Sequence, residues 1–457
     1  MWKRRRELEA RTAVEKRLFE RGRRLRENAA LIFPNTYFAG MSYLGFQQIL
    51  KTLNEDIGLD TRRYFFEHES DPIAMEDFKH LSDFSILLIS VPYENDFGNI
   101  PALLRNAGIE PDKRKRKKEP LIIIGGPALT INPHPLRNVA DIFIFGDGEE
   151  KLERIFSEPE RIRDDAYLEA LSGIKGIKTV PGPNENIGLL ETCYNERDRI
   201  PRSGIISERT FFGNMFLIEI GKGCSQRCKF CTASRIYPQV IHRDSDELNA
   251  IIETGAEQTK RIGLISPCVL DHPGIIDILR YGAEHGLEMS TSSLFLEKIE
   301  SEIVDLLERN GNKSITVAVE SLSEKARFFC GKTVPDRVIL ERADMILRSS
   351  VKILKVYLIL GLPHEEDGPE EQKRLWDGLA DISYSRGGEI HFSVNALVPK
   401  RYTPFAGLGF PGKEKIRRSY ADFKKRFKGM KVKFEPVNDM LDQYYYSRTM
   451  EDILEKV

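Results

Sequence analysis

Two series of short apolar segments alternate with helical segments along this chain of 457 residues. In the first series the runs ALIFPN, FSILLISVP, LIIIGGP and DIFIFGDGEE are separated by helical patterns such as GFQQILKTLNE. Apolar strands divided by helices are typical of a parallel sheet that is covered on both faces. The sequence therefore predicts an α/β chain whose first domain, residues 29–185, is doubly wound and Rossmann-like.

The second series begins at FLIEIGKG and continues through RIGLIS, EMSTSSL, SITVAVE, ILKVYLILG and IHFSVNAL. Six βα-type units of this size favour a partial (β/α)6 barrel of TIM type over residues 211–410, although an open sheet has the same spacing. Between the two series, VPGPNENIG predicts a linker over residues 186–210. Residues 1–28 are predicted to form a basic helix, and residues 411–457 a small helical or mixed C-terminal subdomain.

Three of the six cysteines lie within eight residues, as Cys224, Cys228 and Cys231 in GKGCSQRCKFC. Their loop follows an apolar strand and so lies at the mouth of the sheet or barrel, where ligands usually bind. Thiolates are the usual ligands of iron–sulfur clusters, and three of them leave one iron of a four-iron cluster open. A zinc site would need a fourth protein ligand, and the next Cys or His after Cys231 is His242. The spacing therefore favours a 4Fe-4S cluster over zinc.

This cysteine spacing resembles the signature of the radical S-adenosylmethionine (SAM) superfamily, which has an aromatic residue before the last cysteine, here Phe230. The resemblance covers about residues 213–410. It implies that the open iron binds SAM and that reductive cleavage of the sulfonium yields a 5′-deoxyadenosyl radical. It also implies SAM contacts from Phe230 and from the ends of later strands, at Ser292, Ser293, Glu320, Gly361, Pro363 and Arg401, with Lys400 as the alternative to Arg401.

For each of these later segments the alternative is that it is simply a core strand and its turn, without a role in SAM binding. One segment departs from the family. Members often have a Gly-Gly-Glu stretch that binds the methionine amino group, whereas this chain has ISPCVLDHPG. Members with cobalamin domains often lack that stretch too.

Glycine-rich turns also follow successive strands in the first domain, as GGPALT and GDGEE. Glycine lets the backbone approach a ligand closely. Over residues 29–155 the pattern resembles the cobalamin-binding domain of cobalamin-dependent radical SAM enzymes. The resemblance implies cobalamin contacts from Asn35, Tyr37, Gly40, Ser90, Pro92, Tyr93, Gly125, Gly126, Pro127, Thr130, Gly146, Gly148 and Glu149.

The lower side of the cobalt is predicted to differ from that in many cobalamin domains. Those domains supply a histidine from Asp-x-His-x-x-Gly, whereas this chain has NTYFAG at residues 35–40, and its first histidine is His68. Tyr37 is therefore either near the cobalt or a packing residue. The alternative for the whole domain is a related fold that no longer binds cobalamin.

The two resemblances together imply a cobalamin-dependent radical SAM C-methyltransferase. In such an enzyme one SAM remethylates the cobalamin, a second forms the adenosyl radical, and an unactivated substrate carbon receives the methyl group of methylcobalamin. A cobalamin-using cyclase or rearrangement enzyme is an alternative, as is a non-enzymatic cobalamin-binding module. A methylthiotransferase acting on transfer RNA would normally add a second three-cysteine cluster, but residues 1–192 contain no cysteine.

The net charge of −1 predicts no polyanionic partner for the chain as a whole. Three basic segments, residues 1–28, 113–118 and 413–433, nevertheless suggest a protein or peptide substrate with an acidic face. The alternative for the first is a solvated helix that caps a domain edge. The arrangement resembles methyltransferases that modify arginine or glutamine carbons of methyl-coenzyme M reductase. We expect a low-potential electron donor of ferredoxin or flavodoxin type, anaerobic chemistry, no membrane partner and no nucleic acid.

The remaining cysteines, Cys193, Cys268 and Cys330, are scattered, and we expect core or surface thiols. Cys268 follows a predicted strand, as do His272 and His364, which are weaker candidates for acid–base chemistry. The chain has no apolar run of about 18 residues. Its charged first segment also lacks an apolar signal core, so the sequence predicts a cytoplasmic protein.

Overall fold

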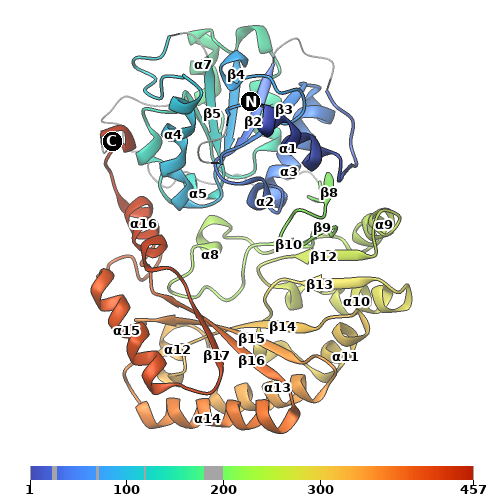
Figure 1. Ribbon diagram of the computed structural model, residues 1–457, viewed down its shortest axis with the longest axis vertical. Helices are drawn as coiled ribbons and strands as arrows, with labels where there is room; N and C mark the ends of the chain where they lie inside the picture. Colours follow the sequence, from blue (N-terminus) through green and yellow to red (C-terminus); the bar gives the residue numbers. More distant parts are fainter. Residues whose placement is uncertain (1, 23–27, 68–70, 118–119, 180–198, 456–457) are drawn as a thin grey trace. The chain divides into compact units, whose positions relative to one another are not determined.

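The computed structural model describes residues 2–22, 28–67, 71–117, 120–179 and 199–455 (Figure 1). The chain divides into two compact units, and each is described by itself. The first unit comprises Met1–Met215 together with Tyr445–Val457, and the second comprises Phe216–Tyr444. The end of the chain thus returns to the first unit, which the sequence did not predict.

The first unit is built on a six-stranded sheet in the order β3-β2-β4-β5-β6-β7, with all neighbours parallel except β6 and β7. Helices lie on both sides of the sheet (Figure 1). The predicted doubly wound fold is therefore confirmed. The direction of winding reverses between β2 and β4, and ligands of such sheets bind outside the carboxyl ends of the strands at that place. The strands are β2 (Ala29–Phe33), β3 (Thr61–Phe65), β4 (Ile86–Ser90), β5 (Leu121–Gly125), β6 (Ile142–Ile144) and β7 (Ile177–Thr179).

Both faces of this sheet are buried, which explains why its strands have continuous apolar runs. Successive side chains of a strand point to opposite faces. Leu31 and Ile123 accordingly belong to one apolar cluster, whereas Ile32 and Ile124 belong to the other. The principal helices are α3 (Leu44–Lys51), which continues as a π-helix (Thr52–Ile57), α4 (Asn99–Asn106), α5 (Pro127–Ile131), α6 (Glu149–Ile155) and α7 (Asp165–Ser172).

Strand β3 was not predicted because its sequence TRRYF contains two arginines. The side chain of Arg63 is nevertheless fully buried, and its guanidinium is 2.6 Å from both the Glu15 and the Glu76 carboxylates. A buried charge is tolerated when it is paired and hydrogen-bonded. The two glutamates come from other segments, so the sequence of β3 by itself does not indicate a buried strand.

The prediction of one helix over residues 1–28 is wrong. Helix α1 ends early (Trp2–Thr12), and β1 (Glu15–Arg17) pairs antiparallel with β8 (Ile205–Ser207). Part of the predicted linker is thus a strand. The pairing joins residues about 190 positions apart in the sequence, so local charge and periodicity carry no sign of it.

The second unit contains two parallel sheets, β13-β12-β9 and β14-β15-β16-β17. A parallel bridge between Leu294 and Val317 connects them. Helices lie along the outside of the curved strands (Figure 1), so the predicted partial barrel is confirmed. The strands are β9 (Phe216–Glu219), β12 (Arg261–Ile265), β13 (Glu288–Thr291), β14 (Ser314–Glu320), β15 (Ile353–Leu360), β16 (Glu389–Ala396) and β17 (Lys431–Phe434).

Strand β17 lies in the tail that was expected to be mainly helical. It extends the sheet beside β16 and is flanked in the sequence by α15 (Lys413–Arg426) and α16 (Val437–Arg448). The other long helices are α9 (Ser245–Ala256), α10 (Ile275–Glu284), α11 (Ser301–Arg309), α13 (Asp336–Arg348) and α14 (Pro369–Arg386). Across the described residues, no helix has the length and apolar character needed to cross a bilayer.

Strands β15 and β16 alternate between buried and accessible side chains. On β15, Val356 and Leu358 are buried, whereas Lys355 and Tyr357 are exposed. On β16 the buried residues likewise alternate with accessible ones such as Asn395. The barrel therefore has one polar, accessible face, and this face is not filled by a close-packed apolar core.

Candidate functional site

The three-cysteine loop begins at the carboxyl end of β9. A short strand, β10 (Gly221–Lys222), pairs with β11 (Ile241–His242) and leads directly into Gly223. Gly223 has a φ of +77°, and an added Cβ would lie 2.1 Å from the Gln239 carbonyl oxygen. Only glycine fits this turn, which directs the following cysteines away from the strand.

Segments far apart in the sequence hold the loop. The Lys229 amide donates to the Cys330 carbonyl at 2.9 Å, and the Lys229 carbonyl accepts from the Phe405 amide at 3.2 Å. The Ser225 hydroxyl donates to Asp271 at 2.6 Å, and Asp271 also pairs with Lys298. These contacts order the loop without using a thiol.

Phe230, the aromatic residue before the last cysteine, packs against an apolar cluster beyond the ends of β15 and β16. The cluster consists of Ala326, Cys330, Leu362, Leu397 and Phe405. The structure thus brings Phe230 beside the carboxyl ends of β15 and β16, and its contact with SAM stays a prediction. It also assigns Cys330 a packing role.

The three thiols share one electrostatic environment. Burial raises the pKa of the Cys228 thiol to about 12, and the Lys332 ammonium opposes this shift, while Glu320 and the other two thiols add to it. Burial likewise raises the pKa of Cys231, and Cys224 and Glu320 act in the same direction. Metal binding displaces thiol protons, so these protons would leave when a cluster forms.

The donor set fits an iron–sulfur cluster. Among the residues that the structure describes, no three His, Cys, Asp or Glu side chains gather tightly enough to hold a single metal ion. A four-iron cluster instead takes its thiolates at separate iron atoms. Three thiols on one ordered loop, close enough to affect one another's pKa values, suit that arrangement.

A fourth thiol lies beside the trio. Cys268 follows β12, is buried, and donates its S–H to the Gly223 carbonyl at 3.4 Å. Its hydrogen bond with Cys224 is the largest cause that lowers the pKa of the Cys224 thiol. The position of Cys268 after a strand was the only sequence signal of this contact.

Glu320 ends β14 in a strained conformation. Its φ is +71°, and the register with β15 shifts between Ala318 and Glu320. A left-handed conformation at a residue other than glycine costs about 1–3 kcal/mol and is often found at functional sites. Burial raises the pKa of the Glu320 carboxyl, and the Lys332 ammonium 3.7 Å away lowers it.

Lys332 is the site residue that the sequence analysis missed. Its side chain is only 4% exposed. The ammonium donates to the Ala318 carbonyl at 3.4 Å and lies 4.8 Å from the centre of the Phe295 ring. Because Lys332 acts on Glu320 and on all three cluster thiols, it is a buried cation within the candidate site. Its place two residues after the buried Cys330 was the only available signal.

The other predicted SAM contacts all follow the carboxyl ends of barrel strands. The Ser292 hydroxyl donates to the Ser266 carbonyl at 2.6 Å, which links the ends of β13 and β12. Gly361 has a φ of +84°, and its amide donates to Glu365, whose pKa burial raises to about 7. Ser293 also follows β13, Pro363 follows β15, and Lys400 and Arg401 follow β16. Their roles in SAM binding stay predictions.

The predicted cobalamin residues gather at the carboxyl edge of the first sheet, after β2, β4, β5 and β6. Where the winding of the sheet reverses, between β2 and β4, the Asn35 side-chain amide donates to Asp96 at 2.7 Å. The Asn99 side-chain amide donates to the Pro34 carbonyl at 2.9 Å. Gly126 has a φ of +124°, and an added Cβ would lie 2.4 Å from the Val91 carbonyl oxygen. This edge is therefore closely connected, and Gly126 is needed for backbone packing as well as for any ligand.

Two of the predicted cobalamin residues, Tyr37 and Gly40, are occupied by contacts within the first unit. The Tyr37 hydroxyl donates to Glu15 at 2.8 Å and lies 3.0 Å from the Ser207 hydroxyl, which can donate to it, and burial raises the tyrosine pKa. An added Cβ at Gly40 would lie 2.5 Å from the Phe65 ring. Of the two alternatives for Tyr37, the structure supports the packing role. His68 lies outside the described residues.

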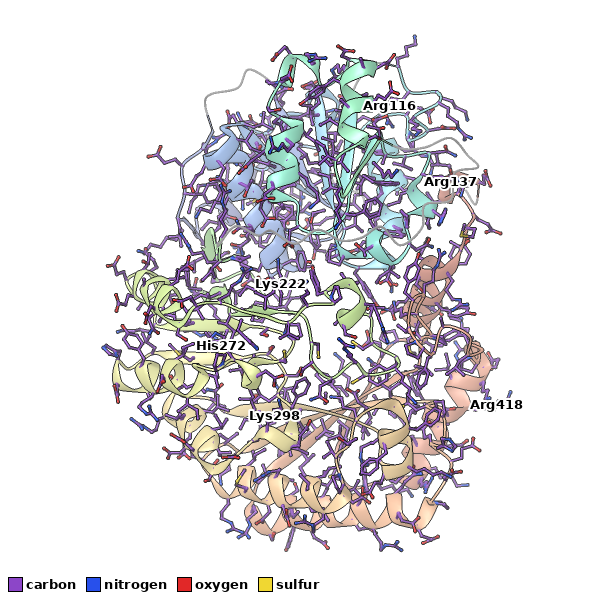
Figure 2. The ribbon with its side chains drawn as sticks, turned by 180° about the vertical axis from the view of Figure 1, so that it is seen from behind. Arg116, Arg137, Lys222, His272, Lys298 and Arg418 are labelled. Carbon is purple, nitrogen blue, oxygen red and sulfur yellow. The ribbon has the colours of Figure 1, made fainter. Side chains whose placement is uncertain are left out.

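The histidine candidates have structural roles. His272, which Figure 2 labels, is buried, and its Nε2 lies 2.8 Å from the Arg243 carbonyl. His364 is accessible and its Nδ1 lies 3.1 Å from Asp367. Cys193 lies outside the described residues.

Comparisons with known proteins agree with this geometry. Residues 218–373 match the profile of the Radical SAM superfamily, and residues 57–181 match that of radical SAM proteins, N-terminal. An uncharacterized protein of Methanocaldococcus jannaschii is 27% identical over 435 residues, which cover 93% of this chain and 90% of that protein.

Two solved structures share the fold of most of the chain. The radical SAM methyltransferase TsrM from Kitasatospora setae, solved with cobalamin and a 4Fe-4S cluster, is 16% identical, and the match covers 83% of this chain and 77% of TsrM with a TM-score of 0.57. The cobalamin-dependent SAM radical enzyme OxsB, solved with aqua-cobalamin and SAM, is 12% identical, and the match covers 87% of this chain and 61% of OxsB with a TM-score of 0.55. Residues 218–373 therefore form a radical SAM domain, and the chain shares the fold of the cobalamin-dependent radical SAM enzymes.

Proposed function

We propose that this chain is a cobalamin-dependent radical SAM C-methyltransferase that acts on an unactivated carbon of a protein or peptide. The observation that carries the proposal is the ordered loop of Cys224, Cys228 and Cys231 at the carboxyl end of β9, with Glu320 and Lys332 in its electrostatic environment. The fold match to TsrM, a methyltransferase solved with cobalamin and a cluster bound, supports the choice of reaction.

The three cysteines would hold a 4Fe-4S cluster, and the carboxyl edge of the first sheet would hold cobalamin. When bound, these groups and SAM supply reductive radical formation and methyl carriage. Phe230 would pack against the nucleoside of SAM, and Glu320 would accept hydrogen bonds from its hydroxyl groups. Lys332 would balance negative charge beside the thiolates, since it is the buried cation that acts on all three.

The polar face of the barrel would receive the substrate. Lys355, Tyr357 and Asn395 leave this face accessible, so a side chain can enter without displacing an apolar core. The proposed class is an arginine or glutamine residue of a protein, as in methyl-coenzyme M reductase, and this narrower choice rests on resemblance. An electron donor of ferredoxin or flavodoxin type would supply the reductant.

A cobalamin-using cyclase or rearrangement enzyme is the second candidate. The fold match to OxsB, a cobalamin-dependent SAM radical enzyme, supports this second candidate as well. The mass of the product separates the two reactions, because methylation adds one methylene unit and rearrangement adds none.

The test is anaerobic reconstitution of the full chain with iron, sulfide, cobalamin and SAM labelled in its methyl group. We expect a spectrum with both cluster and cobalamin bands, release of 5′-deoxyadenosine on reduction, and label in the product. The Cys224, Cys228 and Cys231 triple alanine variant should lose the cluster and the release, whereas Cys193→Ala should keep both. Retention of the cluster without cobalamin or label transfer would contradict methyl transfer.

A further inference from the structure

The segment that carries the three cysteines is basic. Residues 221–240 contain four Lys or Arg and no Asp or Glu. Two of these cations, Arg227 and Lys229, flank Cys228 in the sequence, so their Cα atoms are no more than about 8 Å apart. The cluster chemistry of the proposed function needs an electron donor, and positive charge next to a cluster cysteine suits a donor with an acidic face.

Neither of these two cations is paired with a carboxylate in the part of the chain that the structure describes. Arg227 is exposed, its φ is +49°, and its guanidinium has no hydrogen bond or ion pair there. The Lys229 ammonium lies 4.1 Å from the centre of the Phe329 ring. An aromatic ring attracts a cation without neutralising it, so both charges remain available to an acidic partner.

Exposed aromatic side chains continue this surface onto α12 (Glu324–Cys330). Phe328 and Phe329 are 43% and 38% exposed. The Phe329 ring is held in place by the Phe405 ring, with centroids 6.1 Å apart, and by the His364 ring, with centroids 4.8 Å apart. Aromatic side chains that are exposed in one protein are enriched in its interfaces with others.

The end of α12 contacts the cysteine loop directly. The Lys229 amide donates to the Cys330 carbonyl at 2.9 Å, and an added Cβ at Gly331 would lie 3.7 Å from the Cys228 Cα. A partner that covers the exposed aromatic residues of α12 would therefore lie close to the segment that holds Cys228. Because electron transfer slows steeply with distance, this position suits a protein that delivers electrons to the cluster.

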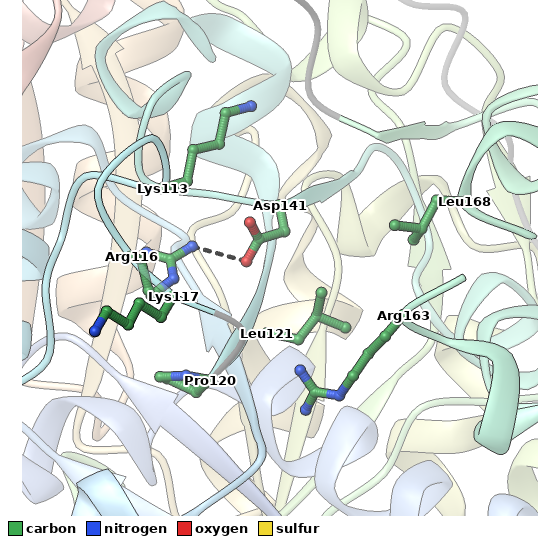
Figure 3. A pocket seen from close by; sticks show the side chains of 8 residues that line it. All are labelled: Lys113, Arg116, Lys117, Pro120, Leu121, Asp141, Arg163 and Leu168. Atoms are coloured by element: carbon green, nitrogen blue, oxygen red, sulfur yellow. Dashed lines mark hydrogen bonds and ion pairs between the residues drawn. The ribbon is translucent and has the colours of Figure 1, made fainter. Parts of the chain in front are cut away.

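The basic run at residues 113–118 in the first unit differs from this surface. Its Arg116 side chain is buried and pairs with Asp141 at 2.7 Å, as Figure 3 shows. Arg114 likewise lies 2.8 Å from Asp112. These cations are engaged within their own unit, whereas the two cations of the cysteine loop have no carboxylate partner among the described residues.

We propose that an acidic one-electron carrier protein docks on this face of the second unit and reduces the cluster from there. The face consists of Arg227, Lys229, Phe328 and Phe329. The carrier would lose one electron and the cluster would gain it. Redox partners bind transiently through interfaces below about 1,200 Å² in total, so a face of a few side chains suits such a partner. The proposal rests on the proposed function, since it needs a cluster that a protein reduces.

The first test is a binding titration that needs no turnover. The full chain with its reconstituted cluster is titrated by calorimetry with a two-cluster ferredoxin, and separately with a flavodoxin. We expect at least one carrier to bind, and to bind more weakly as salt is added. Arg227→Gln and Lys229→Gln together should weaken binding about tenfold, because two exposed charge contacts are lost.

Lys313→Gln is the matched control. Lys313 is exposed and directly precedes β14, so it lies at the amino end of a barrel strand, whereas the cysteine loop follows the carboxyl end of β9. The control removes the same charge away from the proposed face and should change binding less than about twofold. The thermal midpoint of each variant shows whether it is folded.

The second test separates docking from the radical chemistry. Release of 5′-deoxyadenosine is driven either by the reduced carrier or by dithionite. In the Arg227→Gln and Lys229→Gln double variant, and in Phe328→Ser, the KM for the carrier should rise about tenfold and about fivefold. Release driven by dithionite should change less than about twofold. If dithionite drives no release in the wild type, the proposed function is wrong, while the binding titration still decides the docking face.

Four outcomes would overturn the proposal. The first three are no binding of either carrier, equal effects of the double variant and of Lys313→Gln, and displacement of the carrier by a hexaglutamate peptide at equal concentration. The fourth is an equal loss of release with the carrier and with dithionite, because the two cations would then act on the cluster and not on a partner.

Discussion

The Lys332 ammonium lies 3.7 Å from the Glu320 carboxylate, and both side chains are buried beside the cysteine loop. Glu320 ends β14, and Lys332 follows the short helix α12 (Glu324–Cys330). The pair places one negative and one positive group where the three thiols would release their protons when a cluster forms.

Removing the cation should leave a buried, unpaired carboxylate. We predict that Lys332→Met lowers the free energy of unfolding of the second unit by about 3 kcal/mol, because breaking one partner of a buried pair is costly. Adding Glu320→Gln should recover most of the loss. Urea unfolding checks both, and Lys325→Met, at an exposed position on α12, should cost less than about 1 kcal/mol. If both lysine variants lost the same free energy of unfolding, the pairing of Lys332 with Glu320 would not contribute to stability.

Cys268 should tune the cluster without holding it. Hydrogen bonds to cluster sulfurs stabilise the more negative reduced state and raise the reduction potential. We predict that Cys268→Ala keeps the cluster and lowers its potential by on the order of tens of millivolts. Cys268→Ser, which keeps a donor, should lower it less. Spectroelectrochemical titration measures the shift, and loss of the cluster in Cys268→Ala would instead indicate a ligand.

Asp96 should make the first unit less stable as the pH rises. Burial raises its pKa from 3.8 to about 6, opposed by the hydrogen bond from Asn35. The folded state therefore binds the proton more tightly than the unfolded state, and stability falls between about pH 4 and pH 6. Above that range the ionised acid costs at most about 3 kcal/mol.

The variant Asp96→Asn removes this cost, while its carbonyl oxygen still accepts from Asn35. We expect it to be more stable than the wild type above pH 7 and to match it near pH 4, in urea unfolding at each pH. A stability difference that does not vary with pH would assign the effect to packing.

Gly126 and Gly108 allow two effects of a glycine substitution to be compared: a clash of the added Cβ with the backbone, and the cost of a positive φ. Both have positive φ, +124° and +69°, but only at Gly126 would a Cβ meet the backbone, 2.4 Å from the Val91 carbonyl oxygen. Gly108→Ala should cost about 1 kcal/mol. Gly126→Ala should cost at least about 2 kcal/mol more, because two backbone segments must move apart. Thermal unfolding of the two variants measures the difference, and similar midpoints would mean that the edge at β4 and β5 is loosely packed.

Local patterns in the sequence determined the two α/β domains, most of their strands and the three-cysteine loop. Apolar runs and turns are local, and a cluster signature fits within eight residues, so no knowledge of the fold is needed to recognise them. The predicted ligand residues also follow strand ends in the structure, because the chain direction within a parallel sheet determines which ends gather.

Only the tertiary structure decided which side chains meet. The pairing of β1 with β8, the buried Arg63 between two glutamates, and the approach of Lys332 to Glu320 all join segments from different parts of the sequence. The same is true of Tyr37, whose hydroxyl is directed to Glu15 and Ser207. From the local sequence alone, a charged residue is predicted to be exposed. Its burial depends on partners supplied by the fold, since a buried charge is stable only where opposite charge and hydrogen bonds surround it.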